Sequence, residues 1–537
     1  MFLKGGIMKH FLRILLIISF LTFGIISPLI HQVYAQQTII HKDIITKGPW
    51  VDSRSYATLE LANTAAYNAG KLLVVSQNYT LTGANTLTAS VMRIPGSSFT
   101  HTAGSTLAFS GKFQNPSNGH CFIGFDAGDV TFGAGAVKKF YPEWFGAVGG
   151  TTDDLLPIQQ TINSMPSTGG SLVFTLSKYT VSSYITIDRP IDISGMGTEM
   201  TSLFTSSATA NLLYITTGYS CYIHDITLDN AIPRSGGASI YFLNNNNSRI
   251  ERVKFGPTNP GYCHVWSSGS NYWNISQSYF AGAVYGIYIV NVANPDSGDN
   301  TIGPGNLFAY GTTSNCFAIH IDSGGGLKII GNKILGFEYA IDLNLQDSTG
   351  SLVINANSME GQGTSSIRLS QGVSGKTFNG VAITGNQFSG ATNWVLINTG
   401  NTAWLNHLII SGNTGYGPNA SATAFSILGA AYGEISSNNL YGNGTSNAIS
   451  LGVQATNINI SNNNTITWQF PIICASTTSS IHHIGAGGMT YAILAAQVTE
   501  AANGSMIYVS DGTIANPVAG SGTGCIAKRL NGVWVGN

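Results

Sequence analysis

Residues 327–334 read LKIIGNKI, and variants of this phrase recur along the second half of the chain. Each variant has alternating apolar residues, then a turn with an asparagine. The copies are LVINANSM (352–359), VAITGNQF (381–388), LIISGNTG (408–415), GEISSNNL (433–440) and INISNNNT (458–465). The marker asparagines of these copies lie 25 to 29 residues apart: Asn332, Asn357, Asn386, Asn413, Asn438 and Asn463. Looser copies precede them at intervals of 24 to 28 residues, with the markers Asp229, Val253, Ser278 and Asn306. The chain therefore contains an internal repeat.

This repeat predicts a parallel β-helix, in which each coil contains three short strands. A unit near 25 residues, with strand-type alternation and no helix between copies, is too short for alternating strands and helices. We expect the marker asparagine at a bend between strands, where it tolerates the left-handed backbone conformation. Its side-chain amide would also hydrogen-bond to the asparagine of the next coil. The asparagines are thus interpreted as a structural ladder and not as ligands.

The first 35 residues have the pattern of a secretory signal peptide. A basic start is followed by an apolar stretch from about Ile14 to Ile30 and by the small-residue site Val33-Tyr34-Ala35. A retained membrane anchor is the alternative, but the apolar stretch is short and is interrupted by Pro28. The sequence therefore predicts cleavage after Ala35, a secreted or cell-surface location and no membrane contact of the mature chain.

The composition is that of a β-rich, turn-rich extracellular protein. The chain has 65 Gly, only 9% charged residues and a formal net charge of −1. A nucleic-acid partner would require a basic face, so none is expected. The six cysteines are scattered without the close spacing of zinc ligands, so no metal site and no cofactor is predicted. The compartment permits disulfides, but none is assigned.

A shorter run between the marker phrases carries the candidate site. The first aliphatic residue of each run, such as Ile240 or Ile319, is expected to point into the core, and the next residue to point outward. On successive coils the outward residues are Tyr241, Trp266, Tyr288, His320, Asp342 and Arg368. Two residues further along lie Asp322, after His320, and Asn344, after Asp342.

Three aromatic and three ionisable residues on adjacent coils, about 4.8 Å apart, indicate a binding face. Tyr and Trp rings suit stacking on sugar rings, so Tyr241, Trp266 and Tyr288 are predicted to bind substrate, together with Asn344. Asp342 would favour protonated His320 on one side and be kept ionised by Arg368 on the other. The alternative interpretation is a cross-strand ladder of ion pairs that only stabilises the sheet.

Residues 141–187 resemble the opening segment of pectate-lyase-like right-handed β-helix proteins; they read YPEWFGAVGGTTDDLLPIQQTINSMPSTGGSLVFTLSKYTVSSYITI. This superfamily includes polygalacturonase and rhamnogalacturonase relatives and phage tailspike-like proteins. Its usual form has an Asp-Gly pair where this chain has Gly149-Gly150. With the repeats, the resemblance covers roughly residues 141–467 and implies an all-β, right-handed parallel β-helix. It says little about chemistry, because the Gly-His-Gly and Arg-x-Lys signature of the polygalacturonases is not found here.

Two further regions flank the predicted β-helix. Residues 36–140 are predicted to form a β-rich unit, since AGKLLVVSQNYTLTG (69–83) echoes GGSLVFTLSKYTVSS (169–183). Residues 468–537 are predicted to form a small C-terminal β module for capping or oligomerisation. That module includes an Ala-rich helix, YAILAAQVTEAAN, and a hairpin around Asn531-Gly532. A homotrimer is one assembly that the tailspike-like resemblance allows.

Asp153 and Asp154 precede a short helical pattern, LLPIQQTINSM, and are interpreted as N-terminal helix caps and not as a catalytic pair. We expect this helix to cover the end of the β-helix, because an open coil exposes apolar core and unpaired strand edges.

The outward residues support three hypotheses about function on a polysaccharide, the expected partner. In a lyase acting on an acidic polymer, Arg368 would neutralise a uronate, His320 or Tyr288 would remove the ring proton, and Asp342 would orient His320. In a glycoside hydrolase, Asp342 and Asp322 would be acid and base, at a stem separation of about 8 Å. In a glycan-binding spike or adhesin, the aromatic residues would bind the glycan and no bond would be cleaved. The remaining alternative is a purely structural fibre. Carboxylates on this face could hold calcium, but no cluster of them requires it.

Overall fold

The computed structural model describes residues 49–483 and three C-terminal strands, 506–509, 525–530 and 533–536, and the predicted signal peptide lies outside this part of the chain. Short gaps interrupt the first range, at residues 217, 219, 257, 291–297, 312–314, 348, 399–403, 418–421, 445–446, 469 and 476–478. The chain divides into two compact units between Val137 and Lys138. Each unit is described separately below.

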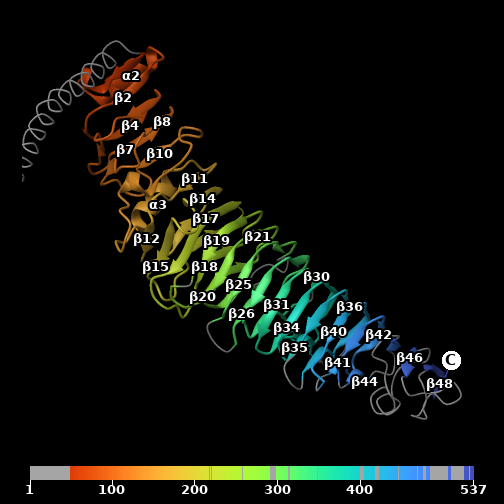
Figure 1. Ribbon diagram of the computed structural model, residues 1–537. Helices are drawn as coiled ribbons and strands as arrows, with labels where there is room; N and C mark the ends of the chain where they lie inside the picture. The colour runs from red at the N-terminus through yellow and green to blue at the C-terminus, as the bar shows by residue number, and fades with distance from the viewer. Residues whose placement is uncertain are drawn as a thin grey trace, which may run out of the picture. The chain divides into compact units, whose positions relative to one another are not determined.

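The N-terminal unit is a small solenoid of parallel strands with one α-helix near its start (Figure 1). The helix α2 (Leu59–Asn68) starts at Thr58, whose hydroxyl accepts the N–H of Leu61 at 3.2 Å. The strands form three parallel sheets around a phenylalanine-rich core that includes Phe99, Phe109 and Phe122. The sheets are β1 (Trp50–Asp52), β2 (Leu72–Val75), β5 (Val91–Arg93) and β8 (Phe113–Gln114); β4 (Ala84–Leu87), β7 (Thr106–Phe109) and β10 (Val130–Phe132); and β3 (Tyr79–Thr80), β6 (Phe99–Thr100) and β9 (Phe122–Ile123), with a 3-10 turn η1 at Ser53–Ser55.

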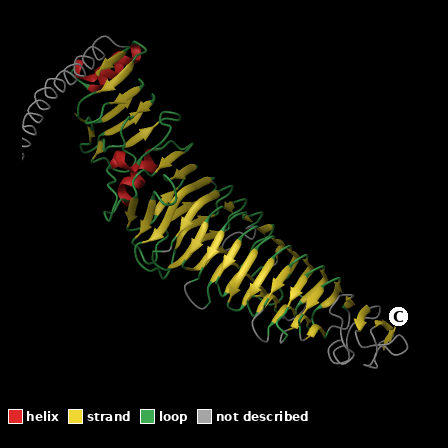
Figure 2. Ribbon diagram, in the orientation of Figure 1, coloured by secondary structure: helices red, strands yellow, loops and turns green. Residues whose placement is uncertain are grey.

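The second unit is a parallel β-helix, as the repeat predicted (Figure 2). Among the described residues, one sheet of 12 strands carries the candidate site. Its strands are β13 (Ile185–Ile187), β16 (Leu213–Thr216), β18 (Ala238–Leu243), β20 (Gly261–Ser268), β23 (Ala283–Val290), β26 (Phe317–Ile321), β29 (Tyr339–Leu345), β32 (Ser365–Gln371), β35 (Asn393–Ile397), β38 (Thr423–Ile427), β41 (Asn447–Leu451) and β44 (Phe470–Cys474). Each coil adds one strand to this sheet, in parallel with the strand before it.

The remaining strands of the coils and the three C-terminal strands form a sheet of 26 strands, counted over the described residues. They are β11 (Gly170–Val173), β12 (Lys178–Val181), β14 (Ile191–Ser194), β15 (Ser202–Thr205), β17 (Cys221–Asn230), β19 (Arg249–Phe255), β21 (Asn274–Ser276), β22 (Tyr279–Ala281), β24 (Thr301–Ile302), β25 (Leu307–Ala309), β27 (Leu327–Ile330), β28 (Lys333–Leu335), β30 (Thr349–Asn355), β31 (Ser358–Gln362), β33 (Phe378–Thr384), β34 (Gln387–Gly390), β36 (Leu405–Ser411), β37 (Thr414–Tyr416), β39 (Ala430–Ser436), β40 (Asn439–Tyr441), β42 (Thr456–Ser461), β43 (Asn464–Ile466), β45 (Ser480–His483), β46 (Met506–Val509), β47 (Cys525–Leu530) and β48 (Val533–Gly536). A coil such as β26, β27 and β28 therefore contains the three predicted strands.

The core is a stack of aliphatic residues from successive coils. Ile319 lies opposite Ile287 on one side and Ile341 on the other, and all three have 0% of their surface exposed. The inward positions predicted from the sequence are all buried: Ile240, Val265, Ile287, Ile319, Ile341, Ile367, Val395 and Ile449. The register adds one position that the sequence analysis missed, Phe425 in β38, which lies between Val395 and Ile449.

The asparagine ladder is confirmed. The side-chain amide of Asn332 donates to Oδ1 of Asn357 at 2.9 Å, and the backbone N–H of Asn332 donates to the same oxygen at 3.0 Å. Both bonds recur at each of the following steps, which join Asn357, Asn386, Asn413, Asn438 and Asn463. All these asparagines are buried, so their role is to hold neighbouring coils together.

The left-handed residue, however, lies one position before the asparagine, which corrects the role predicted for that side chain. The φ angle is 66° at Gly331, 55° at Ala356 and 57° at Ser437.

One upstream marker was also wrong. The register of β17 and β19 pairs Ile226 with Val253, so Ile226, and not Asp229, occupies the marker position of its coil.

The helix α3 (Leu155–Ser164) precedes the first coil, after a 3-10 turn η2 (Pro142–Phe145), and buries Ile158 and Ile162. Asp154 occupies its N-cap position, but the predicted cap is wrong for this side chain. Its carboxylate instead accepts the N–H groups of Val148 and Gly149, at 3.0 and 3.1 Å. This loop comes so close to β12 that a Cβ on Gly149 would lie 2.5 Å from the carbonyl oxygen of Lys178, which explains the glycine.

Asp153 does accept a helix N–H, that of Leu155, at 3.1 Å, and it also accepts the N–H of Ser182. Both carboxylates of this pair are therefore used in local structure.

At the other end, β47 and β48 form the predicted antiparallel hairpin, in which Leu530 lies opposite Val533. The residues of its turn and the predicted Ala-rich helix lie outside the described residues. In the described part of the chain, no helix has both the length and the apolarity needed to cross a membrane.

Candidate functional site

The predicted site residues all lie on one face of the 12-stranded sheet. The parallel register places Tyr241, Trp266, Tyr288, His320, Asp342 and Arg368 on six successive strands, from β18 to β32. Asp322 follows the last residue of β26, and Asn344 lies in β29 opposite Ser370. These eight residues are called the His320 face below. The structure thus brings together every residue that the sequence analysis proposed.

A continuous network of hydrogen bonds and ion pairs joins the ionisable residues of this face. His320 lies between two carboxylates: its Nδ1 is 2.7 Å from Oδ2 of Asp342, and its Nε2 is 3.1 Å from Oδ1 of Asp322. Arg368 binds Asp342 through two nitrogens, Nε at 2.5 Å and Nη2 at 3.0 Å. The network therefore alternates between hydrogen-bond donors and carboxylates.

Two further side chains extend the network at Asp322. The hydroxyl of Tyr288 donates to Oδ2 of Asp322 at 2.6 Å, and the amide of Asn344 donates to Oδ1 at 3.3 Å. Asp322 therefore accepts bonds from three different side chains.

The side chains of the His320 face are more buried than the flat, exposed face that the sequence predicted. The side chain of Asp342 has 0% of its surface exposed, and that of His320 has 11%. Arg368 retains 24%, and the aromatic residues Tyr241, Trp266 and Tyr288 are half-buried. Alternation along the strand does direct Asp342 away from the core, but His320 and Arg368 bind its oxygens and cover it. The predicted exposure is thus wrong at Asp342 and His320.

The sequence analysis missed a second column of aromatic residues that provides part of this cover. Tyr285, Phe317 and Tyr339 lie opposite one another on β23, β26 and β29, and their rings are stacked at centroid distances of 5.4 and 5.2 Å. The guanidinium of Arg368 lies 3.9 Å from the ring centroid of Tyr339, a cation–π contact. A sequence signal exists for this column. An aromatic residue stands two positions before the inward isoleucine in three consecutive runs, YGI, FAI and YAI.

The surroundings shift the pKa values of these groups in opposite directions. Burial alone would lower the pKa of His320, but the hydrogen bonds to Asp322 and Asp342 outweigh it and raise that pKa to about 9. Burial would raise the pKa of Asp322, but the bonds from His320 and Tyr288 leave it below its usual value. Burial and the bond to Asp322 both raise the pKa of Tyr288. At neutral pH the face therefore has a protonated His320, an ionised Asp322 and a neutral Tyr288.

Metal binding has no support in this part of the protein. Among the residues that the structure describes, no group of three or more His, Cys, Asp or Glu side chains is arranged to hold a metal ion. The two carboxylates of the His320 face are instead occupied by His320, Arg368 and Tyr288.

The chain was compared with known proteins. No protein-family model and no curated protein sequence matches it. Among solved structures, the A-module of mannuronan C-5 epimerase AlgE6 from Azotobacter vinelandii is 14% identical, with a TM-score of 0.40 over 65% of this chain and 99% of that one. The DFA-IIIase of Arthrobacter chlorophenolicus A6 is 11% identical, with a TM-score of 0.45 over 66% and 94%. The Dettilon tailspike protein (gp208) is 14% identical, with a TM-score of 0.42 over 68% and 70%. A likeness at this level concerns the fold alone.

Proposed function

We propose that the protein cleaves an extracellular acidic polysaccharide by β-elimination, with the polymer bound along the His320 face. The observation that carries this proposal is the position of His320, held between two carboxylates at the end of a row of aromatic side chains. A structural ladder of ion pairs would not require a Tyr hydroxyl and an Asn amide to converge on the same carboxylate, as they do on Asp322.

The aromatic row supplies the binding surface. The rings of Trp266 and Tyr288 are 5.2 Å apart, and those of Tyr241 and Trp266 are 5.5 Å apart, so the half-buried rings form one unbroken surface. Tyr214, one strand further, stacks on Tyr241 at 5.4 Å and lengthens the row. Aromatic side chains offer sugar rings a rigid apolar area with a polar edge. A row across four strands suits a polymer and not a single sugar.

The distribution of accessible charge favours an acidic polymer. Asp342 is fully buried; His320 and the ionised Asp322 retain 11% and 13% exposure, and Arg368, with 24%, is the most exposed charge of the face. With a pKa of about 9, His320 is positively charged at neutral pH. A sugar carboxylate bound beside Arg368 would therefore meet a positive charge, and that charge would stabilise the anion which develops after proton removal.

The mechanism follows from the protonation states. A protonated His320 cannot accept a proton, so the ring proton beside the sugar carboxylate passes to Tyr288, while the hydroxyl proton of Tyr288 moves to Asp322 over their 2.6 Å bond. The released electron pair forms the carbon–carbon double bond, the bond to the glycosidic oxygen breaks, and the departing oxygen takes the proton that the protonated His320 supplies. Asp322 then returns a proton to His320 over their 3.1 Å contact. Asp342 does not touch the substrate; it positions His320 and Arg368.

Hydrolysis by Asp322 and Asp342 is less consistent with this geometry. A pair of catalytic carboxyl groups needs one member protonated as the general acid. Both carboxylates here accept bonds from charged donors, and the pKa of Asp322 lies below its usual value. Asp322 is therefore not suited to donate a proton at neutral pH, and Asp342 is buried beneath His320 and Arg368.

One observation favours a second candidate function, a glycan-binding spike without catalysis. Each ion of the His320 face has a partner of opposite charge within the protein, as expected if the charges only hold the sheet in place. In that case the aromatic row alone would bind the polymer. A secreted location and a homotrimer remain predictions under either function.

A polysaccharide screen tests the proposal. The protein is incubated with polygalacturonate, alginate and a neutral glucan, and ultraviolet absorbance of unsaturated products is recorded in parallel with reducing ends. We expect absorbance with an acidic polymer, and its loss by about 10²- to 10⁴-fold in Tyr288→Phe and Asp322→Asn. Binding by these variants should persist, whereas Trp266→Ala should lose binding. Reducing ends without absorbance would indicate hydrolysis, and retention of a polymer with neither signal would indicate the binding function.

A further inference from the structure

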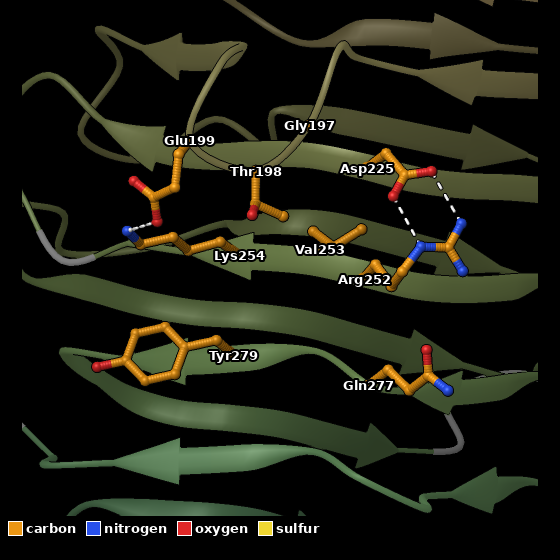
Figure 3. A pocket seen from close by; sticks show the side chains of 9 residues that line it. All are labelled: Gly197, Thr198, Glu199, Asp225, Arg252, Val253, Lys254, Gln277 and Tyr279. Carbon is orange, nitrogen blue, oxygen red and sulfur yellow. Dashed lines mark hydrogen bonds and ion pairs between the residues drawn. The ribbon is translucent and has the colours of Figure 1, made fainter.

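A second site candidate lies on the 26-stranded sheet, away from the residues used above. It is an open cleft of about 660 Å³, within the usual range for ligand sites (Figure 3). One wall is the loop of residues 197–199, which joins β14 to β15, and the other walls come from β17, β19 and β22. The lining residues are Gly197, Thr198, Glu199, Asp225, Arg252, Val253, Lys254, Gln277 and Tyr279.

The charges of this cleft are paired at its two ends. Arg252 binds Asp225 through Nε at 2.7 Å and Nη2 at 2.8 Å, and Lys254 binds Glu199 at 2.6 Å (Figure 3). The four charged side chains that line the cleft therefore carry no net formal charge. A strongly anionic or cationic ligand would have to break one of these pairs. An uncharged ligand rich in hydroxyl groups fits better, because each ion pair offers both donors and acceptors.

The uncharged residues of the cleft match the same ligand class. Tyr279 offers a half-buried ring, and Val253, between the two ion pairs, is buried in the core beneath the cleft. Gln277 adds an amide that can both donate and accept, and Thr198 adds a hydroxyl. An aromatic ring surrounded by groups that bind hydroxyls suits a sugar ring, which has an apolar face and polar edges.

The backbone explains how three polar side chains come to line one cleft. Asp225, Arg252 and Gln277 have φ angles of 54°, 52° and 51°, in the left-handed region that large side chains rarely adopt. They occupy the bend position that Gly331, Gly385 and Gly412 fill in later coils. Ala356 and Ser437 have the same conformation at this position of other coils, so the bend belongs to the coil and sets the direction of the side chain that it carries. Here it places three polar side chains in one cleft.

A histidine cluster fixes the Asp225 end of the cleft. His224 lies between Asp225 and Asp192, with Nδ1 2.6 Å from the first carboxylate and Nε2 2.9 Å from the second. The ring of Tyr222 stacks on His224 at 4.2 Å, and its hydroxyl donates to Glu251 at 2.6 Å. Asp225 is thereby held from both sides, which keeps its oxygens and Arg252 in fixed positions.

We propose that this cleft is a second carbohydrate-binding site, which holds neutral sugar units and is separate from the His320 face. Such a site would anchor the protein to a neutral glycan, or to a neutral stretch of the polymer, while the His320 face acts on acidic units. The two sites lie on different sheets, so a polymer could occupy either one alone. The proposal does not depend on the function assigned to the His320 face.

Saturation-transfer NMR with maltohexaose, cellohexaose and mannohexaose tests the proposal. We expect signals from at least one of these neutral probes with the wild-type protein, and the same signals with Trp266→Ala, which alters only the other sheet. Tyr279→Ala and Gln277→Ala should each weaken binding at least tenfold. Tyr272→Ala is the matched control, because Tyr272 is 59% exposed and does not line the cleft.

Three results would overturn the proposal. The first is no signal from any of the three probes, and the second is binding that survives Tyr279→Ala combined with Gln277→Ala. The third is binding that Trp266→Ala abolishes, which would place the sugar on the His320 face. A loss of polysaccharide cleavage in Asp322→Asn, with neutral-sugar binding unchanged, would show that the two sites can fail separately.

Discussion

The β-helix carries two clusters with the same chemical composition on two different sheets. In each, a histidine lies between two aspartates, and an arginine binds one of these aspartates through two nitrogens. On the 12-stranded sheet, the central aspartate is Asp342, between His320 and Arg368. On the 26-stranded sheet it is Asp225, between His224 and Arg252. The bond lengths are similar, so the two clusters differ mainly in their surroundings.

Burial separates the two clusters. The side chain of Asp342 has 0% exposure, whereas that of Asp225 has 34%, and Arg368 has 24% where Arg252 has 41%. Water screens an exposed ion pair and solvates each partner when the pair breaks. A buried pair has no such substitute, so the loss of one partner leaves an unsolvated charge. Substitution of these side chains should therefore cost little stability on the 26-stranded sheet and much more on the 12-stranded sheet.

The largest expected difference is between Asp342→Asn and Asp225→Asn. The first change leaves the protonated His320 and Arg368 without their buried carboxylate and should lower the free energy of unfolding by about 3–5 kcal/mol. The second should lower it by less than about 1 kcal/mol, because the cluster is open to water. Urea unfolding of both variants measures the difference. Equal losses would mean that burial does not distinguish the clusters.

The next effect is the pH dependence of stability. The pKa of His320 is raised from its ordinary value of 6.5 to about 9, so its contribution to stability is complete below about pH 6.5 and is lost as pH rises through about 9. The shift corresponds to about 3 kcal/mol. Unfolding measured between pH 6 and 10 should show this loss, and His320→Gln should remove the slope. A wild-type curve that is flat over this range would contradict the raised pKa.

The repeat allowed much of this architecture to be predicted from the sequence. A period near 25 residues and alternation of two residues fix which side chains point inward, and the eight residues of the His320 face follow from that register. The bend position was missed by one residue, because the sequence marks the buried asparagine more strongly than the left-handed residue before it. Local alternation gives the direction of a side chain but not what covers it, so the burial of Asp342 could not be predicted.

The His224 cluster was missed for a different reason. Asp192, Asp225 and Arg252 come from three separate strands or bends, and their phrases deviate from the asparagine consensus. The phrase HDITLDN indicated only a further copy of the repeat. Its predicted marker, Asp229, lies three residues after Ile226, which occupies the marker position in the structure. A cleft that depends on a loop such as 197–199 has no periodic signal, so it becomes visible only in three dimensions.

A smaller effect is expected from the two tyrosines that donate to carboxylates. Tyr288→Phe removes the 2.6 Å bond to Asp322 and should cost about 1.5–3 kcal/mol of stability, in addition to the loss of cleavage proposed above. Tyr222→Phe removes an equally short bond to Glu251, but Glu251 keeps two arginines, at 2.8 and 2.9 Å. We expect a cost of about 0.5 kcal/mol there, because both arginines, 54% and 41% exposed, still neutralise the carboxylate of Glu251. Thermal unfolding of the two variants, with polymer cleavage as the second readout, compares them.

The smallest effect is expected when the arginine of each cluster is replaced by lysine. Lysine cannot bind a carboxylate through two nitrogens in the planar arrangement of a guanidinium. Arg368→Lys would also lose the contact with Tyr339, 3.9 Å from the ring centroid, so it should cost about 1–2 kcal/mol. Arg252→Lys should cost a few tenths of a kcal/mol, because its pair with Asp225 is exposed. Since salt screens exposed charges far more than buried ones, the cost of Arg252→Lys should vanish in 1 M NaCl while that of Arg368→Lys persists. If salt abolished both costs, the His320 face would be as open to solvent as the second cluster, and the assignment of its charges to a desolvated site would fail.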